Sequence, residues 1–239
     1  MTRPHTITRG AAFLAILLLV LATASCRRED ARLRSMINLE PSPPPEERVE
    51  QLREVIGEHE AMVAQALQSA MKQADALKLL AQEYMRQELY GPALDALDEA
   101  IRIEPRNQIL HHLAGVAAGF LGKSQAEPQV RSAYYARAER SYELAIEAAP
   151  NYTDARYGLA VLYVFEIGEP VKAIPHLEHV LERNESHVPS LFVLARAHVA
   201  LGNIDDAIGA YDRVIRVATD RETRRRAERN RRLLLGGSS

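Results

Sequence analysis

The sequence contains no tryptophan, a single cysteine, and only 12 glycines and 12 prolines among 239 residues. One cysteine excludes an internal disulfide framework and any metal site built from several thiolates. The absence of tryptophan and the small numbers of glycine and proline argue against a β-sandwich or barrel, whose many turns require glycine and proline. Alanine, leucine and glutamate instead recur at helical spacing, and 47% of the residues are hydrophobic. The composition therefore predicts a helical globular chain of one or two domains.

Motifs that carry catalysis are also missing. The sequence has no glycine-rich phosphate loop and no Gly-x-Ser-x-Gly elbow. His176 and His179 share one helix face at a spacing that suits zinc, but a zinc site needs a third protein ligand and outer groups that orient the imidazoles. We predict that these histidines are solvated or partly packed, and that the protein is not an enzyme and has no catalytic residue, metal or cofactor. A metal-binding or enzymatic accessory protein is the minor alternative.

The N-terminus has the layout of a secretory signal. Arg3, His5 and Arg9 precede an apolar run over residues 11–22, and no acidic residue occurs before Glu29. A basic start, a run of about 12 apolar residues and then small residues are typical of export signals. The run is shorter than the roughly 20 residues that a helix needs to cross a bilayer.

The end of this segment, Thr-Ala-Ser-Cys at residues 23–26, resembles the bacterial lipoprotein signal, although Thr23 stands where that family prefers leucine. The resemblance implies that residues 1–25 are removed, that Cys26 is acylated, and that the exported protein is anchored by lipid in the cell envelope. The residue after the cysteine is Arg27. In the enterobacterial sorting rule, aspartate at this position would retain the protein at the inner membrane, so the resemblance favours the outer membrane, facing the periplasm. An ordinary cleaved signal and an uncleaved anchor are the alternatives.

A tether and a helix follow the signal. Residues 26–45 are charged and then proline-rich, which predicts a stiff extended spacer. Residues 46–73 are predicted to form a helix, with apolar residues three and four apart at Val49, Leu52, Ile56, Val63, Ala66 and Ala70 and with His59 in the same series. We favour a helix packed on the next segment, because the two alanines are weak coiled-coil contacts. A self-associating coiled coil is the alternative.

Residues 76–105 predict two amphipathic helices joined by a turn at 89–92. Such a pair cannot bury its apolar face alone, so it implies neighbours of the same kind. Counted from Ala74, positions 4, 7, 8, 11, 20, 24, 27 and 32 hold Leu77, Leu80, Ala81, Tyr84, Ala93, Leu97, Ala100 and Pro105. These residue types at these positions resemble the tetratricopeptide repeat, a degenerate helical hairpin of about 34 residues.

Similar units follow in tandem. We place four of them at 74–219, with bounds 74–107, 108–152, 153–187 and 188–219. The second exceeds the repeat by about 11 residues, predicted as a longer turn around 123–132. The third has a turn one residue longer than the pattern and Pro175 inside its second helix, where a proline removes a hydrogen bond. The arginine-rich segment 220–239 is predicted to be a capping helix and tail. The resemblance implies an all-α, right-handed superhelical solenoid of about four hairpins, with an N-terminal flanking helix and a C-terminal capping helix.

In the tetratricopeptide superhelix, the first helix of each unit lines a concave groove. The resemblance places there His112, Val116, Phe120, Tyr157, Val161, Phe165, Phe192 and Arg196. Exposed apolar patches mark partner sites, and an extended or helical peptide fits such a groove. We predict a membrane-tethered scaffold of the bacterial envelope that binds a protein or peptide partner, not nucleic acid, and supports assembly of an envelope complex. The helix at 46–73 or the insertion filling the groove is the alternative, and the oligomeric state is open.

Overall fold

The computed structural model describes residues 44–236. The signal at 1–25, Cys26 and the tether up to residue 43 lie outside the described residues. Within the described range all regular structure is helical, with nine α-helices and one π-helical turn. The elements are α2 (Pro45–Arg86), α3 (Tyr90–Ile103), α4 (Gln108–Ser124), α5 (Pro128–Ala148), α6 (Thr153–Leu162), η1 (Tyr163–Ile167), α7 (Pro170–Arg183), α8 (Val188–Ala200), α9 (Ile204–Val217) and α10 (Arg221–Gly236).

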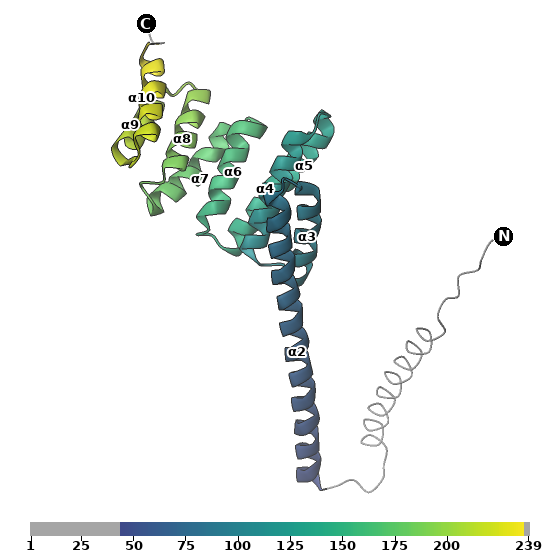
Figure 1. The fold of residues 1–239 in the computed structure, drawn as a ribbon. Helices are drawn as coiled ribbons and strands as arrows, with labels where there is room; N and C mark the ends of the chain where they lie inside the picture. Colours follow the sequence, from purple (N-terminus) through teal and green to yellow (C-terminus); the bar gives the residue numbers. More distant parts are fainter. Residues whose placement is uncertain (1–43, 237–239) are drawn as a thin grey trace, which may run out of the picture. The chain divides into compact units, whose positions relative to one another are not determined.

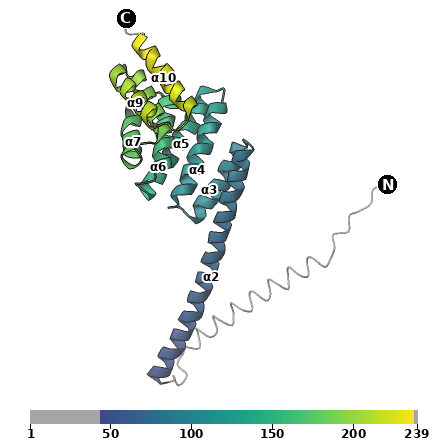
Figure 2. The ribbon, with the colours of Figure 1, turned by 60° about the vertical axis from the view of Figure 1, so that its left-hand side comes forward.

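The chain divides into two compact units within α2, between Gln65 and Ala66. In the second unit the helices from α3 to α10 follow one another in space in chain order (Figures 1 and 2). Each packs on the next, and α4 also contacts α6, as α6 contacts α8. The first helices of successive hairpins therefore form one row. A hairpin in such an array is stabilised mainly by its neighbours.

Small residues allow the helices to approach closely. Ala81, Ala93 and Ala100, predicted at the crossing of the first two repeat helices, are fully buried. Leu80, predicted beside them in the packed face, is instead 43% exposed. The reason is that α2 is the first helix of the described array, so no earlier helix covers its outer side. No break separates the predicted helix at 46–73 from the first repeat, since α2 is continuous to Arg86.

Tyr142 of α5 fills the space between three helices. Its ring faces Gly115 of α4 and Gly158 of α6, and a Cβ atom on either glycine would lie 2.7 Å from a ring carbon. Real Cβ atoms do not approach that closely, so both positions accept the ring only because they lack a side chain. The tyrosine is 6% exposed. One aromatic side chain and two glycines thus fix the packing of the second hairpin against the third.

The insertion in the second repeat does not form a long turn, so that prediction is wrong. Only three residues separate the end of α4 at Ser124 from the start of α5 at Pro128, and the two helices are 17 and 21 residues long. Proline is tolerated in the first turn of a helix, which is where Pro128 lies. The extra residues lengthen the helices and bury Tyr135 against Gly122 of α4.

A recurring hydrogen bond closes the joints between helices. The fourth residue of α4, α6 and α10 bonds the carbonyl oxygen six residues earlier: His111 to Pro105 at 2.9 Å, Arg156 to Pro150 at 2.9 Å and Arg224 to Ala218 at 2.7 Å. His111 is 5% exposed, so it is a structural histidine. In α8 the fourth residue is apolar, and His187 caps the helix instead by accepting from the Ser190 backbone N–H at 3.3 Å.

Candidate partner-binding groove

Two hollows lie along the row formed by α4, α6 and α8. The smaller, of about 180 Å³, lies between α4 and α6 and includes Val116, Phe120 and Val161 in its lining. The larger, of about 610 Å³, is lined from α6, η1, α8 and α10 and includes Tyr157, Val161, Phe165 and Phe192. Val161 lines both. Six of the eight predicted groove residues are therefore brought together around two adjoining hollows.

The other two predicted residues lie elsewhere. Arg196 is exposed on α8 and lines neither hollow. His112 is half-buried, with its ring centroid 5.9 Å from that of Tyr142 and 5.5 Å from that of Tyr152. His112 is thus part of the packing between hairpins more than part of an open surface.

Phe120 is held in place by a residue that the sequence pattern did not single out. Its ring stacks on that of Tyr90, with centroids 4.6 Å apart and an angle of 5° between the planes. Tyr90 falls in the predicted turn at 89–92, but it begins α3. The stacking orients a phenylalanine that is 46% exposed, so the smaller hollow has a pre-positioned aromatic ring at its side.

The π-helical turn η1 presents Phe165 to the larger hollow. The turn runs from Tyr163 to Ile167 and ends at Gly168, whose φ of +79° favours glycine. The third repeat is predicted to have a turn one residue longer than the pattern, and η1 accommodates this extra residue within the helix. Phe165 itself is 52% exposed.

Two tyrosines fasten this turn. Tyr135 of α5 donates a hydrogen bond of 2.6 Å to Glu166, and Tyr163 donates one of 2.8 Å to Glu139. Burial and the Glu166 carboxylate raise the pKa of Tyr135 to about 12, so the hydroxyl keeps its proton and donates at neutral pH. The exposed Phe165 is therefore carried on a firmly bonded backbone.

The larger hollow also contains a cation. The Arg226 guanidinium of α10 lies 4.0 Å from the centroid of the Phe192 ring, which packs edge-on against Tyr211 at 6.0 Å. A guanidinium over an aromatic face is an attractive arrangement. The sequence predicts α10 only as a cap, because nothing in the order of its arginines indicates which of them faces α8. The hollow thus combines aromatic surfaces with one arginine.

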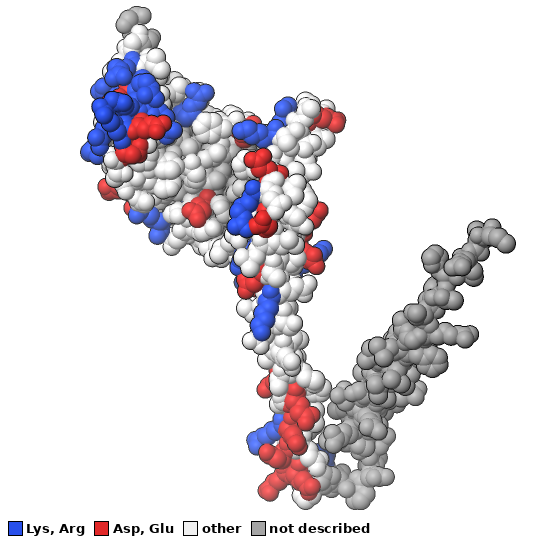
Figure 3. All heavy atoms as spheres, viewed as in Figure 1, with Lys and Arg blue, Asp and Glu red and all other residues white. Residues whose placement is uncertain are grey.

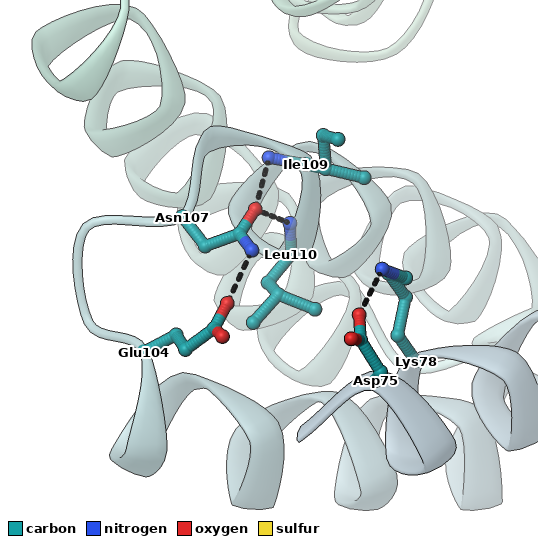
Figure 4. A network of polar contacts seen from close by, with 6 residues as sticks. All are labelled: Asp75, Lys78, Glu104, Asn107, Ile109 and Leu110. Carbon is teal, nitrogen blue, oxygen red and sulfur yellow. Dashed lines mark hydrogen bonds and ion pairs between the residues drawn. The ribbon is translucent and has the colours of Figure 1, made fainter. Parts of the chain in front are cut away.

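The first repeat has a polar face. Lys78 bonds Asp75 at 2.6 Å, and Asn107 caps α4 by accepting from the backbone N–H of Ile109 at 3.0 Å (Figure 4). The same asparagine donates to Glu104 at 2.5 Å. These side chains bond one another and the backbone, so the apolar part of the groove begins with the second hairpin.

The His176 and His179 pair is engaged by arginines. Arg156 lies 3.5 Å from His176, and Arg183 donates to His179 at 3.2 Å. Burial and then the Arg156 charge lower the pKa of both histidines. Nearby guanidinium groups also oppose a metal cation. No group of three His, Cys, Asp or Glu side chains placed to hold a metal occurs within residues 44–236.

Acid is expected to destabilise the fold through His112. Burial lowers its pKa below the ordinary 6.5, and its buried Nδ1 makes no hydrogen bond among the described residues. Between the two pKa values the unfolded chain binds more protons than the folded one, so stability falls as pH drops below about 6.5. Urea unfolding at about pH 7.5 and pH 5 should show this loss, and His112→Gln should reduce it. An equal loss in the wild type and in His112→Gln would contradict the assignment.

The surface charge is uneven. Lysine and arginine gather over α10, as Figure 3 shows.

Within the described part of the chain, no helix combines the length and apolar character that crossing a bilayer requires.

Comparison with known proteins agrees with this geometry. A family model described as a tetratricopeptide repeat matches residues 164–227. This match and the similar proteins below support a tetratricopeptide repeat protein. A TPR repeat-containing protein of Borreliella burgdorferi is 23% identical over 177 residues, which cover 74% of this chain and 77% of that protein. The predicted fold class, an all-α repeat solenoid, is confirmed.

Two solved structures show the same repeat fold. A thermophilic TPR protein of Thermus thermophilus superposes with a TM-score of 0.58 at 21% identity, covering 76% of this chain and 94% of that one. YrrB, described as a TPR protein with an unusual peptide-binding site, gives a TM-score of 0.53 at 20% identity, covering 75% and 88%. The fold indicates a protein-interaction scaffold.

Proposed function

We propose that this protein is a scaffold of the bacterial cell envelope, tethered to a membrane through lipid on Cys26, whose repeat groove binds an apolar segment of a protein partner and supports assembly of an envelope complex. The observation that carries the binding role is the pair of hollows that share Val161. They present two exposed phenylalanines on one face of the solenoid. Large apolar side chains that remain exposed beside a hollow mark interaction sites.

The groove chemistry suits a peptide with apolar anchors. Phe120 and Phe165 offer flat rings, and rigid aromatic side chains contribute most to binding when they are already oriented. Arg226 at the larger hollow adds one site for an acidic group of the partner. The peptide-binding site in the name of YrrB, which shares the fold, supports a peptide as the ligand class.

Phe165→Ala should reduce partner capture about tenfold or more, the effect of removing a central aromatic anchor. A photocrosslinker placed at Ser186, which is exposed and lines the larger hollow, can record captured proteins in envelope extracts by mass spectrometry. Phe165 is a better choice than Phe192, because Phe192 also packs on Tyr211 and its loss would disturb the fold.

Val171→Ala is the matched control. Val171 is 64% exposed on α7 and lines neither hollow. It therefore tests the loss of an exposed apolar side chain away from the groove. The same set of partners at the same yield in wild type and Phe165→Ala would refute the groove as the binding site.

A further inference from the structure

The N-terminal half of α2 exposes an apolar stripe. No residue between Pro45 and Gln65 is buried. Large apolar side chains there are 43–66% exposed, at Val49, Leu52, Ile56, Met62 and Val63. A helix with such a stripe is only marginally stable in water unless the stripe is covered. This half of α2 thus lacks a packing partner within the described chain.

The stripe has the spacing of a coiled-coil seam. With Val49 as position a, Ile56 and Val63 are also a residues, while Leu52 and His59 are d residues. The outward positions of the same heptads are occupied by glutamate, glutamine, glycine and alanine. Apolar residues at a and d form the seam of a coiled coil, and one polar core residue helps to fix the register.

We propose that this segment pairs with the same segment of a second copy of the chain, in an antiparallel two-stranded coiled coil. With Ile56 of one copy opposite His59 of the other, Leu52 lies opposite Val63. The two-fold symmetry of the dimer repeats each of these two contacts, so roughly three heptads of each helix contribute to the interface. The proposal does not rest on the groove function.

The flanking charges decide the orientation. A parallel pair would place Arg48 opposite Arg53 of the second copy, the g-to-e contact that sets strand direction, so like charges would meet. The antiparallel register places Arg53 opposite Glu60 on one side of the seam. On the other side it places the apolar Val55 opposite Met62. Charge complementarity therefore favours the antiparallel arrangement.

Arg53 is free to make this contact. Its ion pair is with Glu50, one turn earlier, at 3.4 Å, and the two side chains are 72% and 77% exposed. Exposed pairs of this kind contribute little to stability. Replacing the Arg53–Glu50 ion pair by one between Arg53 and Glu60 of the second copy therefore costs little free energy.

A disulfide test separates the orientations. The full chain with Cys26→Ser is purified in mild detergent with either Leu52→Cys or Val63→Cys and oxidised alone or as a mixture. The mixture should yield covalent dimers, whereas each chain alone should yield few. In the antiparallel register, residue 52 of one copy lies opposite residue 63 of the other. The two copies of residue 52 are therefore 11 residues, or about 16 Å, apart along the helix axis. Efficient crosslinking of Leu52→Cys to itself would overturn the orientation.

Sedimentation of the chain without engineered cysteines tests the pairing itself. A dimer is expected, and Ile56→Arg should convert it to a monomer while circular dichroism shows the repeats still folded. Glu54→Ala, on the outward face of the same helix, should leave the dimer intact. Arg53→Glu should weaken the dimer about tenfold, and adding Glu60→Arg should restore it. A monomer in the wild-type chain, or a dimer that survives Ile56→Arg, would overturn the proposal.

Discussion

Tyr142→Ala is expected to lower the free energy of unfolding by about 3–5 kcal/mol, the usual cost of deleting a buried aromatic ring. The ring is enclosed by Gly115 and Gly158, so its removal leaves a cavity where three helices meet. Neither glycine has a side chain that could fill this space. Urea unfolding followed by circular dichroism measures the change. Tyr134→Ala, a half-buried tyrosine of the same helix, should cost clearly less.

A double-mutant cycle tests the explanation itself. Gly158→Ala alone should destabilise the protein, because its Cβ would meet the Tyr142 ring at 2.7 Å. In the Tyr142→Ala background the same change should be tolerated, since the obstructing ring is gone. Strictly additive effects would show that the glycine does not act through the tyrosine.

Cys26→Ala is expected to move the protein from the membrane fraction to the soluble fraction almost completely. Acyl chains hold a protein to a bilayer through about 0.8 kcal/mol for each buried methylene, and more than one chain makes the attachment durable. The single cysteine is the only residue that can carry them by the lipoprotein route. Fractionation followed by an alkaline wash distinguishes anchored protein from protein held by a membrane-bound partner.

The control for this experiment lies three residues upstream. Thr23→Leu introduces the residue that the lipoprotein signal prefers. It should therefore keep the protein in the membrane fraction and speed cleavage of the signal. Retention of Cys26→Ala in washed membranes would identify the apolar run at 11–22 as an uncleaved anchor.

The sequence predicts the fold well because the repeat leaves a pattern in local residue types. In a tandem array, alanine at the repeat positions of Ala81 and Ala100 indicates that two helices cross closely there. Both residues are fully buried. The groove face followed from the same count, which placed Val161 and Phe165 on one side. Their approach to Phe192 then follows from the stacking of successive hairpins.

The pattern predicts less where contacts depend on three-dimensional detail. Whether an insertion forms a loop or lengthens two helices depends on the pairing of Tyr135 with Gly122, which no local signal announces. The contact of Arg226 with Phe192 joins residues of two helices whose relative rotation the sequence does not specify. Nothing in the sequence marks His111 as a structural residue, and only its bond to the Pro105 carbonyl does so.

The π-helical turn at Tyr163–Ile167 has a consequence for how such a groove can diversify. One added residue is taken up inside the turn, so the core positions before and after it keep their places in the repeat. Only the side chains carried by the turn change direction, and Phe165 is one of them. Length variation by a single codon can therefore alter which ring a solenoid offers to its ligand while the packing between hairpins is inherited unchanged.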